Sequence, residues 1–220
     1  LDFVNTNFAA AGSDFDPWTP TDWNPSPALI AAVQQANTSE AAVYAPWAAS
    51  LNSLWLSLGR KLAPDVAVSP QRHSYIPMLY PTIVPGGRFR ESYYWDSFFI
   101  VQGLLSCDMH LTALNLIRNL LSDVETFGFV PNGGRIYYLD RSQPPMLACM
   151  IDRYQQYIED ASPALSSDID GTGLTLMQFL NNTAFPLLKR EHDWWMDPVT
   201  GHTVNVNATT TDASSPAQQQ

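Results

Sequence analysis

The sequence is poor in cysteine, and its few cysteines and histidines do not form a metal-binding pattern. Cys107 and Cys149 are the only cysteines among 220 residues, and no metal-ligand spacing occurs among them and the four histidines. We therefore expect no metal site. The two cysteines are predicted to be small buried residues on separate helices. A disulfide between them is the alternative.

Positive charge is also scarce. The 11 lysines and arginines are outnumbered by 21 aspartates and glutamates, which gives a net charge of -10 and a pI of about 4.6. Nucleic acids and anionic membrane surfaces select basic proteins, so neither is an expected partner. No run approaches the ~20 apolar residues of a membrane-spanning helix. A neutral sugar is compatible with this charge, although the charge does not select for one.

Apolar residues are abundant, at 45% of the chain, and most of them recur with the period of a helix. One domain, residues 1–197, is predicted to bury them in an all-α core. Expected helices cover residues 28–37, 39–62 with an interruption or bend at Pro46, 91 or 93 to 107, 109–127, a helix opened by Pro144 and Pro145, 174–182 and 185–196, the last two separated near Pro186. Asp108 is the expected N-cap of the fourth of these, and Gly128 is expected to end it. No segment predicts a credible sheet.

The remaining segments have the composition of loops. Residues 1–27 and 63–84 are rich in proline, which prevents long helices. Trp18 and Trp23 are expected to anchor the first of these segments to the domain. Residues 129–143 are predicted to form a loop with a short hairpin at positions 136–139. Residues 198–220 are rich in Thr, Ser, Ala and Gln, and we expect a low-complexity, disordered tail.

Two arginine-bearing motifs stand out from this background. Residues 85–102 read PGGRFRESYYWDSFFIVQ, and residues 128–145 read GFVPNGGRIYYLDRSQPP. Glycines and prolines make stiff turns that hold side chains in place beside a helix. Arginine and carboxylate groups bind hydroxyls with charge-assisted hydrogen bonds, and indole rings pack on the C–H surfaces of sugars. The motifs therefore favour a polar, ring-shaped ligand.

Together the two motifs resemble the signatures of the α,α-trehalases, glycoside hydrolase family 37. The first is similar to that family's Pro-Gly-Gly-Arg-Phe and Tyr-x-Trp-Asp motif, and the second to its Pro-Asn-Gly and Arg-Ser-Gln-Pro-Pro motif. The resemblance runs from about Phe3 to Asp197, less than half of a usual member. It implies an (α/α)6 toroid of the six-hairpin glycosidase type. Six or seven helical segments are too few for twelve, so about half of the toroid is expected here, and the other half is a possible partner.

The resemblance also implies a substrate, trehalose, and a set of residues that bind it. The activity would be hydrolysis of trehalose to two glucose molecules with inversion, without any cofactor. The implied substrate-binding residues are Arg88, Trp95, Asp96, Asn132, Arg141, Ser142 and Gln143.

Each of these residues also has an ordinary structural alternative. Trp95 could be helix packing, Asn132 a turn former and Ser142 a helix cap. Asp96 is expected to accept a sugar hydroxyl or to orient Arg88, because an unpaired carboxylate on so apolar a helix is costly. Glu91 and Asp140 are expected to pair with neighbouring arginines. The histidines, His73 among them, form no convergent pattern and are expected on the surface or satisfied in the interior.

No catalytic residue is predicted in this chain. Inverting hydrolysis needs two carboxyl groups about 6.5–9.5 Å apart. The family's Gly-Trp-Asp segment with the acid, its preceding Arg-Pro-Glu segment and its later segment with the base do not occur in the sequence. Activity of this chain alone is thus open, and the alternative is a non-catalytic remnant that binds trehalose. Sequons at Asn37, Asn181 and Asn207 favour a secreted protein.

Overall fold

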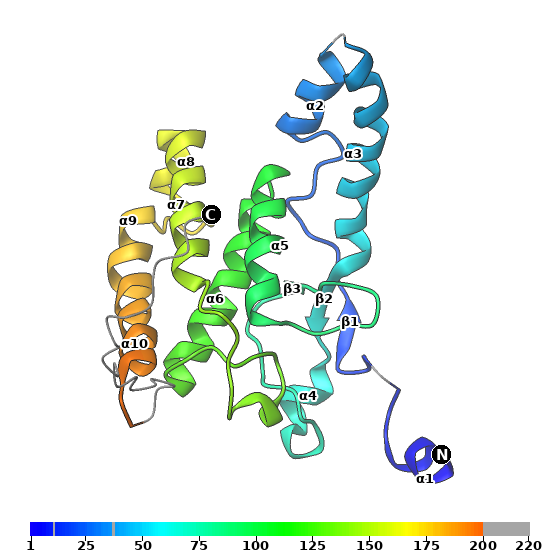
Figure 1. Cartoon of the computed structure of the whole chain (residues 1–220), viewed down its shortest axis with the longest axis vertical. Coiled ribbons are helices and arrows are strands. Elements are labelled where there is room, and N and C mark those ends of the chain that lie inside the picture. Colours follow the sequence, from blue (N-terminus) through cyan, green and yellow to red (C-terminus); the bar gives the residue numbers. More distant parts are fainter. Residues whose placement is uncertain (11, 37, 200–220) are drawn as a thin grey trace, which may run out of the picture.

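Helices dominate the part of the chain that the structure, a computed structural model, describes: residues 1–10, 12–36 and 38–199 (Figure 1). The α-helices are α1 Asp2–Asn7, α2 Ala28–Gln35, α3 Ser39–Leu58, α4 Pro64–Val68, α5 Tyr94–Ser106, α6 His110–Phe127, α7 Leu147–Ala161, α8 Pro163–Ser167, α9 Leu176–Phe179 and α10 Phe185–Met196. Short 3-10 helices form at η1 Pro70–Arg72 and η2 Ile136–Tyr138, and a π-helical turn at η3 Leu180–Ala184. The all-α prediction is confirmed.

The central body consists of α5, α6, α7 and α10. Helices α5 and α7 contact each other, α6 contacts both of them, and α10 packs on α6. The buried face of α7 is the one that its periodicity predicts, with Leu147, Met150, Ile151, Tyr154 and Ile158 all inside. Only a short connection separates α5 from α6, so the two are antiparallel. The first turns of α5 and α7 therefore lie at the same end of the body as the last turn of α6.

Gly128 ends α6 in the left-handed conformation, at φ 89°, as its position predicts. Asp108, however, is not the N-cap of α6. It has a positive φ of 60°, and Met109 occupies the cap position. The Asp108 carboxylate instead accepts the backbone N–H of Ala28 at 2.7 Å, which fixes the start of α2 to the body.

Helix α3 departs from its predicted packing. It runs without interruption through Pro46. Only its last turn is packed on the core, through Trp55 and Leu58. A Cβ on Gly103 would lie 2.9 Å from the Trp55 ring, so the glycine permits this close contact. Farther back, Trp47 and Leu54 are 61% and 51% exposed, so the predicted buried face is wrong for most of the helix.

A small antiparallel sheet corrects the expectation that the chain has none. Strands β1 Phe15–Pro17, β2 Gly59–Leu62 and β3 Thr82–Ile83 pair in the order β1-β2-β3. These strands have 3, 4 and 2 residues, too few to show an alternating pattern, and they come from distant parts of the chain. A Cβ on Gly59 would lie 2.0 Å from the carbonyl oxygen of Trp18, so only glycine fits where β2 leaves α3.

The helical break expected near Pro186 is also absent. Helix α9, the π-helical turn η3 and α10 follow one another without a gap. The π-helical turn ends immediately before α10, in which Pro186 occupies the first turn. Pro186 lacks the backbone N–H of a regular helical residue, and its place just after the π-helical turn coincides with a change in the helical hydrogen-bond pattern.

Other local predictions were wrong or are untested. Positions 136–138 form a 3-10 turn rather than a hairpin. Both cysteines are free: Cys107 is half-buried and accepts the Trp55 indole N–H at 3.4 Å, whereas Cys149 is exposed. The disulfide is therefore wrong, and so is burial of Cys149. Trp18 and Trp23 pack against the core as expected. Of the tail predicted at residues 198–220, residues 200–220 lie outside the described residues, as do the sequons at Asn37 and Asn207.

Candidate functional site

The two motif loops meet at the N-terminus of α5. The backbone N–H of Tyr94 donates to the carbonyl of Asn132 at 3.2 Å. The next N–H, that of Trp95, donates to the side-chain oxygen of Gln143 at 3.0 Å. The Asn132 N–H in turn donates to the Arg141 carbonyl at 3.0 Å. The second loop therefore caps the helix that the first loop begins, and the predicted site residues Trp95, Asn132, Arg141 and Gln143 come together there.

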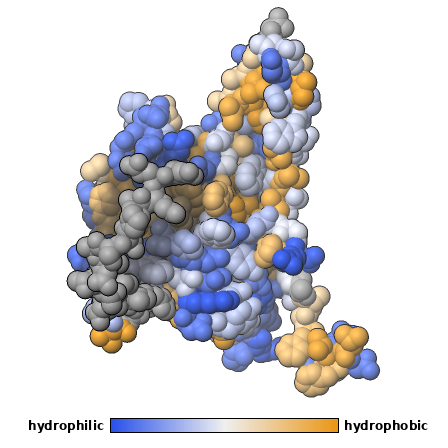
Figure 2. Space-filling model, viewed as in Figure 1, coloured by the Kyte–Doolittle hydropathy of each residue, from blue (hydrophilic) through white to orange (hydrophobic). Residues whose placement is uncertain are grey.

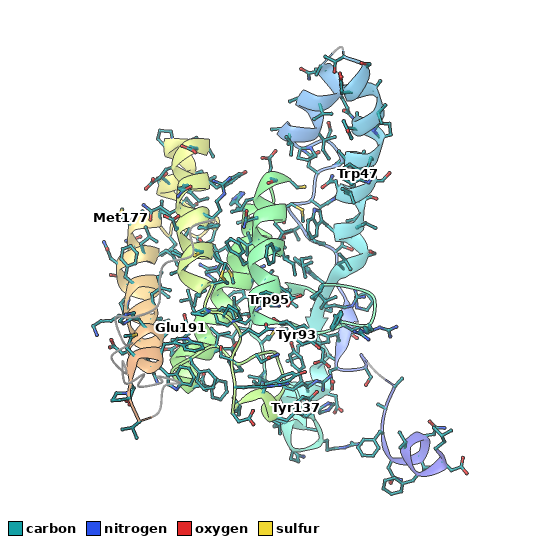
Figure 3. The ribbon with its side chains drawn as sticks, viewed as in Figure 1. Trp47, Tyr93, Trp95, Tyr137, Met177 and Glu191 are labelled. Carbon is teal, nitrogen blue, oxygen red and sulfur yellow. The ribbon has the colours of Figure 1, made fainter. Side chains whose placement is uncertain are left out.

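Arg88 and Arg141 occupy the two ends of one row of aromatic rings. The Arg88 guanidinium lies 4.9 Å from the centroid of Phe89, and that of Arg141 lies 5.0 Å from the centroid of Tyr138. Tyr93 stands between these rings, with its centroid 5.8 Å from Phe89 and 6.3 Å from Tyr138. Both arginines are exposed. The row connects the two arginines through a chain of ring contacts, and Figure 3 marks Tyr93 and Trp95 at the start of α5.

Trp95 and Asp96 are on the first turn of α5 and are available to a ligand. Trp95 is 46% exposed and contacts Phe99 edge-on at 6.4 Å, so it is not ordinary core packing. Asp96 is half-buried and forms no hydrogen bond or ion pair with any described residue, Arg88 included. The alternative in which Asp96 orients Arg88 is therefore not what the structure shows.

Two other predicted site residues have local roles. The Ser142 hydroxyl donates to the Val130 carbonyl at 2.6 Å, which closes its own loop. Asn132 contributes its backbone to the contacts above, and the two glycines after it fit where a side chain would not. A Cβ on Gly133 would lie 3.0 Å from the Ser92 carbonyl, and one on Gly134 would lie 2.2 Å from the Tyr75 hydroxyl.

Glu91 pairs with an arginine, as predicted, and this arginine is Arg135. The Arg135 Nε donates to Glu91 at 2.8 Å, and its Nη1 lies 2.6 Å from an Asp14 oxygen. His73 lies 2.8 Å from Asp14 and 3.0 Å from Asp65. Hydrogen bonds to Asp14 and then Asp65 raise the pKa of His73. The network fastens the second motif loop to β1 and to the α4 region.

The predictions for the histidines and for Asp140 have different outcomes. His73 is satisfied as expected, and His110 stacks on Tyr157 with centroids 6.3 Å apart. Asp140 is exposed and has no arginine partner among the described residues.

Asp123 is a residue that the sequence did not single out. It lines a cavity of about 10 Å³, space for one water molecule, beneath the Gly133–Gly134 turn and beside Tyr75 and Asn119. Burial raises the pKa of Asp123 to about 7. In the sequence it is an ordinary polar position of an amphipathic helix, so no local signal could have identified it.

Within the described residues, no group of three or more His, Cys, Asp or Glu side chains could hold a metal ion. None of the helices that the structure describes is long and apolar enough to cross a membrane.

Arginines over aromatic rings, an exposed indole and a carboxylate with no partner among the described residues are groups that can bind a sugar. The trehalase family model matches residues 1–219. Human trehalase is 44% identical over 174 residues, which cover 79% of this chain and 29% of that protein. Honeybee (Apis mellifera) trehalase is 40% identical over 204 residues, covering 93% and 28%.

Dictyostelium discoideum trehalase is 37% identical over 194 residues, covering 88% of this chain and 29% of that protein. The chain belongs to the trehalase family. It spans less than a third of the length of these relatives.

Proposed function

We propose that this chain forms one wall of the trehalose site of an α,α-trehalase, a glycosidase that hydrolyses trehalose to two glucose molecules with inversion. The observation that carries the proposal is the junction of the two motif loops at the N-terminus of α5. There, Gln143 and the Asn132 carbonyl bond the first two N–H groups of α5. The proposed substrate-binding residues are Arg88, Trp95, Asp96, Asn132, Arg141, Ser142 and Gln143.

Each of these residues makes a different contact with a glucose unit in this proposal. Arg88 and Arg141 donate to sugar hydroxyls from the two ends of the aromatic row, and Asp96 accepts from a third hydroxyl. The exposed face of Trp95 packs on the C–H surface of the ring. Ser142 supports the loop through its bond to Val130, and the Gln143 side chain accepts the backbone N–H of Trp95.

Neither the general acid nor the general base is proposed in this chain, because the family's segments for them do not occur in the sequence. We infer that the remaining part of a trehalase domain supplies both carboxyl groups and completes the toroid. The relatives are more than three times as long as the matched segment. The exposed apolar side chains of α3 are a surface that such a part would cover.

Trehalose binding to the chain, measured by isothermal titration, tests the proposal. Arg141→Ala should weaken binding at least about tenfold, because a hydrogen bond to a charged group contributes about 1.5–3 kcal/mol. Arg153→Ala is the matched control, since Arg153 is exposed on α7 and bonds only Gln156 among the described residues. Equal affinity of Arg141→Ala and wild type would refute the site.

The second candidate is a trehalase remnant that binds trehalose and does not hydrolyse it. The sequence favours this reading to the extent that it lacks the acid and base segments. Glucose release decides between the two: hydrolysis by the chain alone excludes the remnant. Hydrolysis only after the rest of a trehalase domain is added supports the first proposal.

We also propose that the protein enters the secretory pathway, on the basis of its sequons. Asn181 is exposed on the π-helical turn η3. Expression in a secreting eukaryotic host should give a product whose mass falls on glycosidase treatment. A product of unmodified mass, with Asn181→Gln as the reference, would argue against it.

A further inference from the structure

Glu191 is a buried carboxyl group that the site as described so far does not use. It lies on α10, on the side toward α6, and is 4% exposed (Figure 3). The Tyr94 hydroxyl donates to its Oε1 at 2.7 Å. The backbone N–H of Val130 also interacts with this carboxylate. A buried carboxylate needs such donors, because an unpaired one would be very costly.

The Tyr94 hydroxyl makes a second bond that reaches the other motif. It accepts the backbone N–H of Leu147 at 3.0 Å. Leu147 is the first residue of α7 and follows the Arg141–Gln143 segment by only four positions. Tyr94 itself is 1% exposed and is the first residue of α5, next to Trp95. A single hydroxyl therefore joins the starts of α5 and α7, and Glu191 holds that hydroxyl in place.

We propose that Glu191 is a positioning residue that sets the spacing of the two motif loops through Tyr94. This inference rests on the proposed trehalose site. One glucose unit held by Trp95 and Asp96 on one side and by Arg141 on the other needs both sides within about 0.5 Å of their productive placement. Through Tyr94 and Val130, Glu191 contacts the start of α5, and indirectly that of α7, as well as the loop that carries Asn132.

A merely structural role makes a different prediction from a positioning role. Any core substitution lowers stability, but only loss of the Glu191–Tyr94 link should loosen both loop segments together. The losses of trehalose affinity caused by substituting Tyr94 and by substituting Glu191 should also not add in the double variant, because the two residues act as one unit. The amide oxygen of glutamine can still accept from the Tyr94 hydroxyl, so Glu191→Gln should restore most of the effect of the carboxylate.

The test compares Glu191→Ala, Glu191→Gln, Tyr94→Phe and the double variant Tyr94→Phe/Glu191→Ala. Ile158→Ala is the matched control, since Ile158 is fully buried in the C-terminal half of α7, away from the loops. Trehalose titration reports the affinity. Amide hydrogen exchange of segments 92–98 and 141–149 reports the order of the two loops.

We expect Glu191→Ala to weaken trehalose binding on the order of tenfold or more and to speed exchange in both segments. Glu191→Gln should stay within about threefold of wild type, and the double variant should be no worse than Glu191→Ala alone. Ile158→Ala should lower the melting temperature without changing affinity. If Glu191→Ala does not fold, Tyr94→Phe and Glu191→Gln carry the comparison.

Unchanged affinity, faster exchange in only one segment, or equal damage from Glu191→Gln and Glu191→Ala would overturn the inference. The exchange measurement needs no sugar. If the wild-type chain does not bind trehalose, the proposed function fails. In that case, the rate of amide hydrogen exchange in segments 92–98 and 141–149 of Glu191→Ala still decides whether Glu191 links the loops.

Discussion

The central body buries its apolar side chains, whereas the arm formed by α2 and α3 exposes several of them. In the body, Leu104, Ile117 and Met150 are fully buried. On α3, Trp47, Leu51 and Leu54 lie at helical spacing but are 61%, 43% and 51% exposed. Figure 2 shows apolar patches along this arm and mostly polar atoms over the lower centre of the body.

This difference shows that the periodicity of apolar residues predicts a helix but does not predict whether other elements bury its apolar face. Between Glu40 and Arg60 the sequence has no charged residue, so α3 does not have the charged face of a helix that borders solvent. The body does carry charged residues, among them Arg118, which pairs with Asp170. The composition of the arm is therefore that of a helix buried by other protein, although its apolar side chains are exposed here. The apolar side chains of the body are buried within the body itself.

The largest expected effect comes from breaking the ion network that fastens the second motif loop to the first motif loop and to the residue before β1. Arg135→Met leaves Glu91 in a largely buried place without its cation and leaves Asp14 with His73 as its remaining partner. The free energy of unfolding should fall by about 3–5 kcal/mol. Urea denaturation measures it, with Arg153→Met as a surface control that should change it by less than about 0.5 kcal/mol. Equal effects of the two substitutions would show that the network does not stabilise the loop.

A matched pair of leucines contrasts the two regions directly. Leu104→Ala removes a fully buried side chain of α5 and should cost about 2–5 kcal/mol. Leu54→Ala removes the same atoms from an exposed position of α3 and should cost less than about 1 kcal/mol. Both changes are measured by urea denaturation of the chain. A cost for Leu54→Ala as large as that for Leu104→Ala would mean that the arm is covered in solution, for example by self-association.

A pH-dependent effect is expected inside the body at Asp123. Burial raises the pKa of Asp123 to about 7 in the folded protein, above the value of about 3.9 in an unfolded chain. The folded state therefore binds the proton more tightly. Its stabilising contribution is complete below about pH 3.9 and is lost as the pH rises to about 7.

Asp123→Asn tests this dependence because asparagine does not titrate. The melting temperature of the variant relative to wild type should rise between about pH 4 and pH 7 and then level off. Thermal unfolding across this range measures it, with the exposed Asp152→Asn as the control. Parallel curves for Asp123→Asn and wild type would show that Asp123 has an ordinary pKa.

The smallest effect is expected on the arm. Trp47→Ser exchanges an exposed indole for a hydroxyl and should change the free energy of unfolding by less than about 0.5 kcal/mol. It should also reduce the binding of an apolar fluorescent dye, since Trp47 contributes to the exposed apolar surface. A large loss of stability would place Trp47 in a packed interface and remove the contrast between the arm and the body.

Much of the helical fold was predictable because its signals are local. The buried face of α7 follows from residues three and four positions apart, and Gly128 ends α6 because glycine adopts a positive φ at low cost. The small sheet was not predictable, since β1 and β2 are short and pair across 43 to 47 residues. The exposed stripe of α3 was not predictable either, because burial depends on what the rest of the structure places against a helix.

For the candidate site, the sequence alone determined which residues are present: two stiff, arginine-bearing loops and a tryptophan–aspartate pair at the start of a helix. Turn chemistry and helix periodicity act over a few residues, so a single sequence contains them. Only the tertiary structure decided that Gln143 caps α5, that Arg135 joins Asp14 to Glu91, and that Glu191 reaches Tyr94. These contacts join residues 44 to 121 positions apart, and only the packing of the whole body brings such distant side chains within hydrogen-bonding distance.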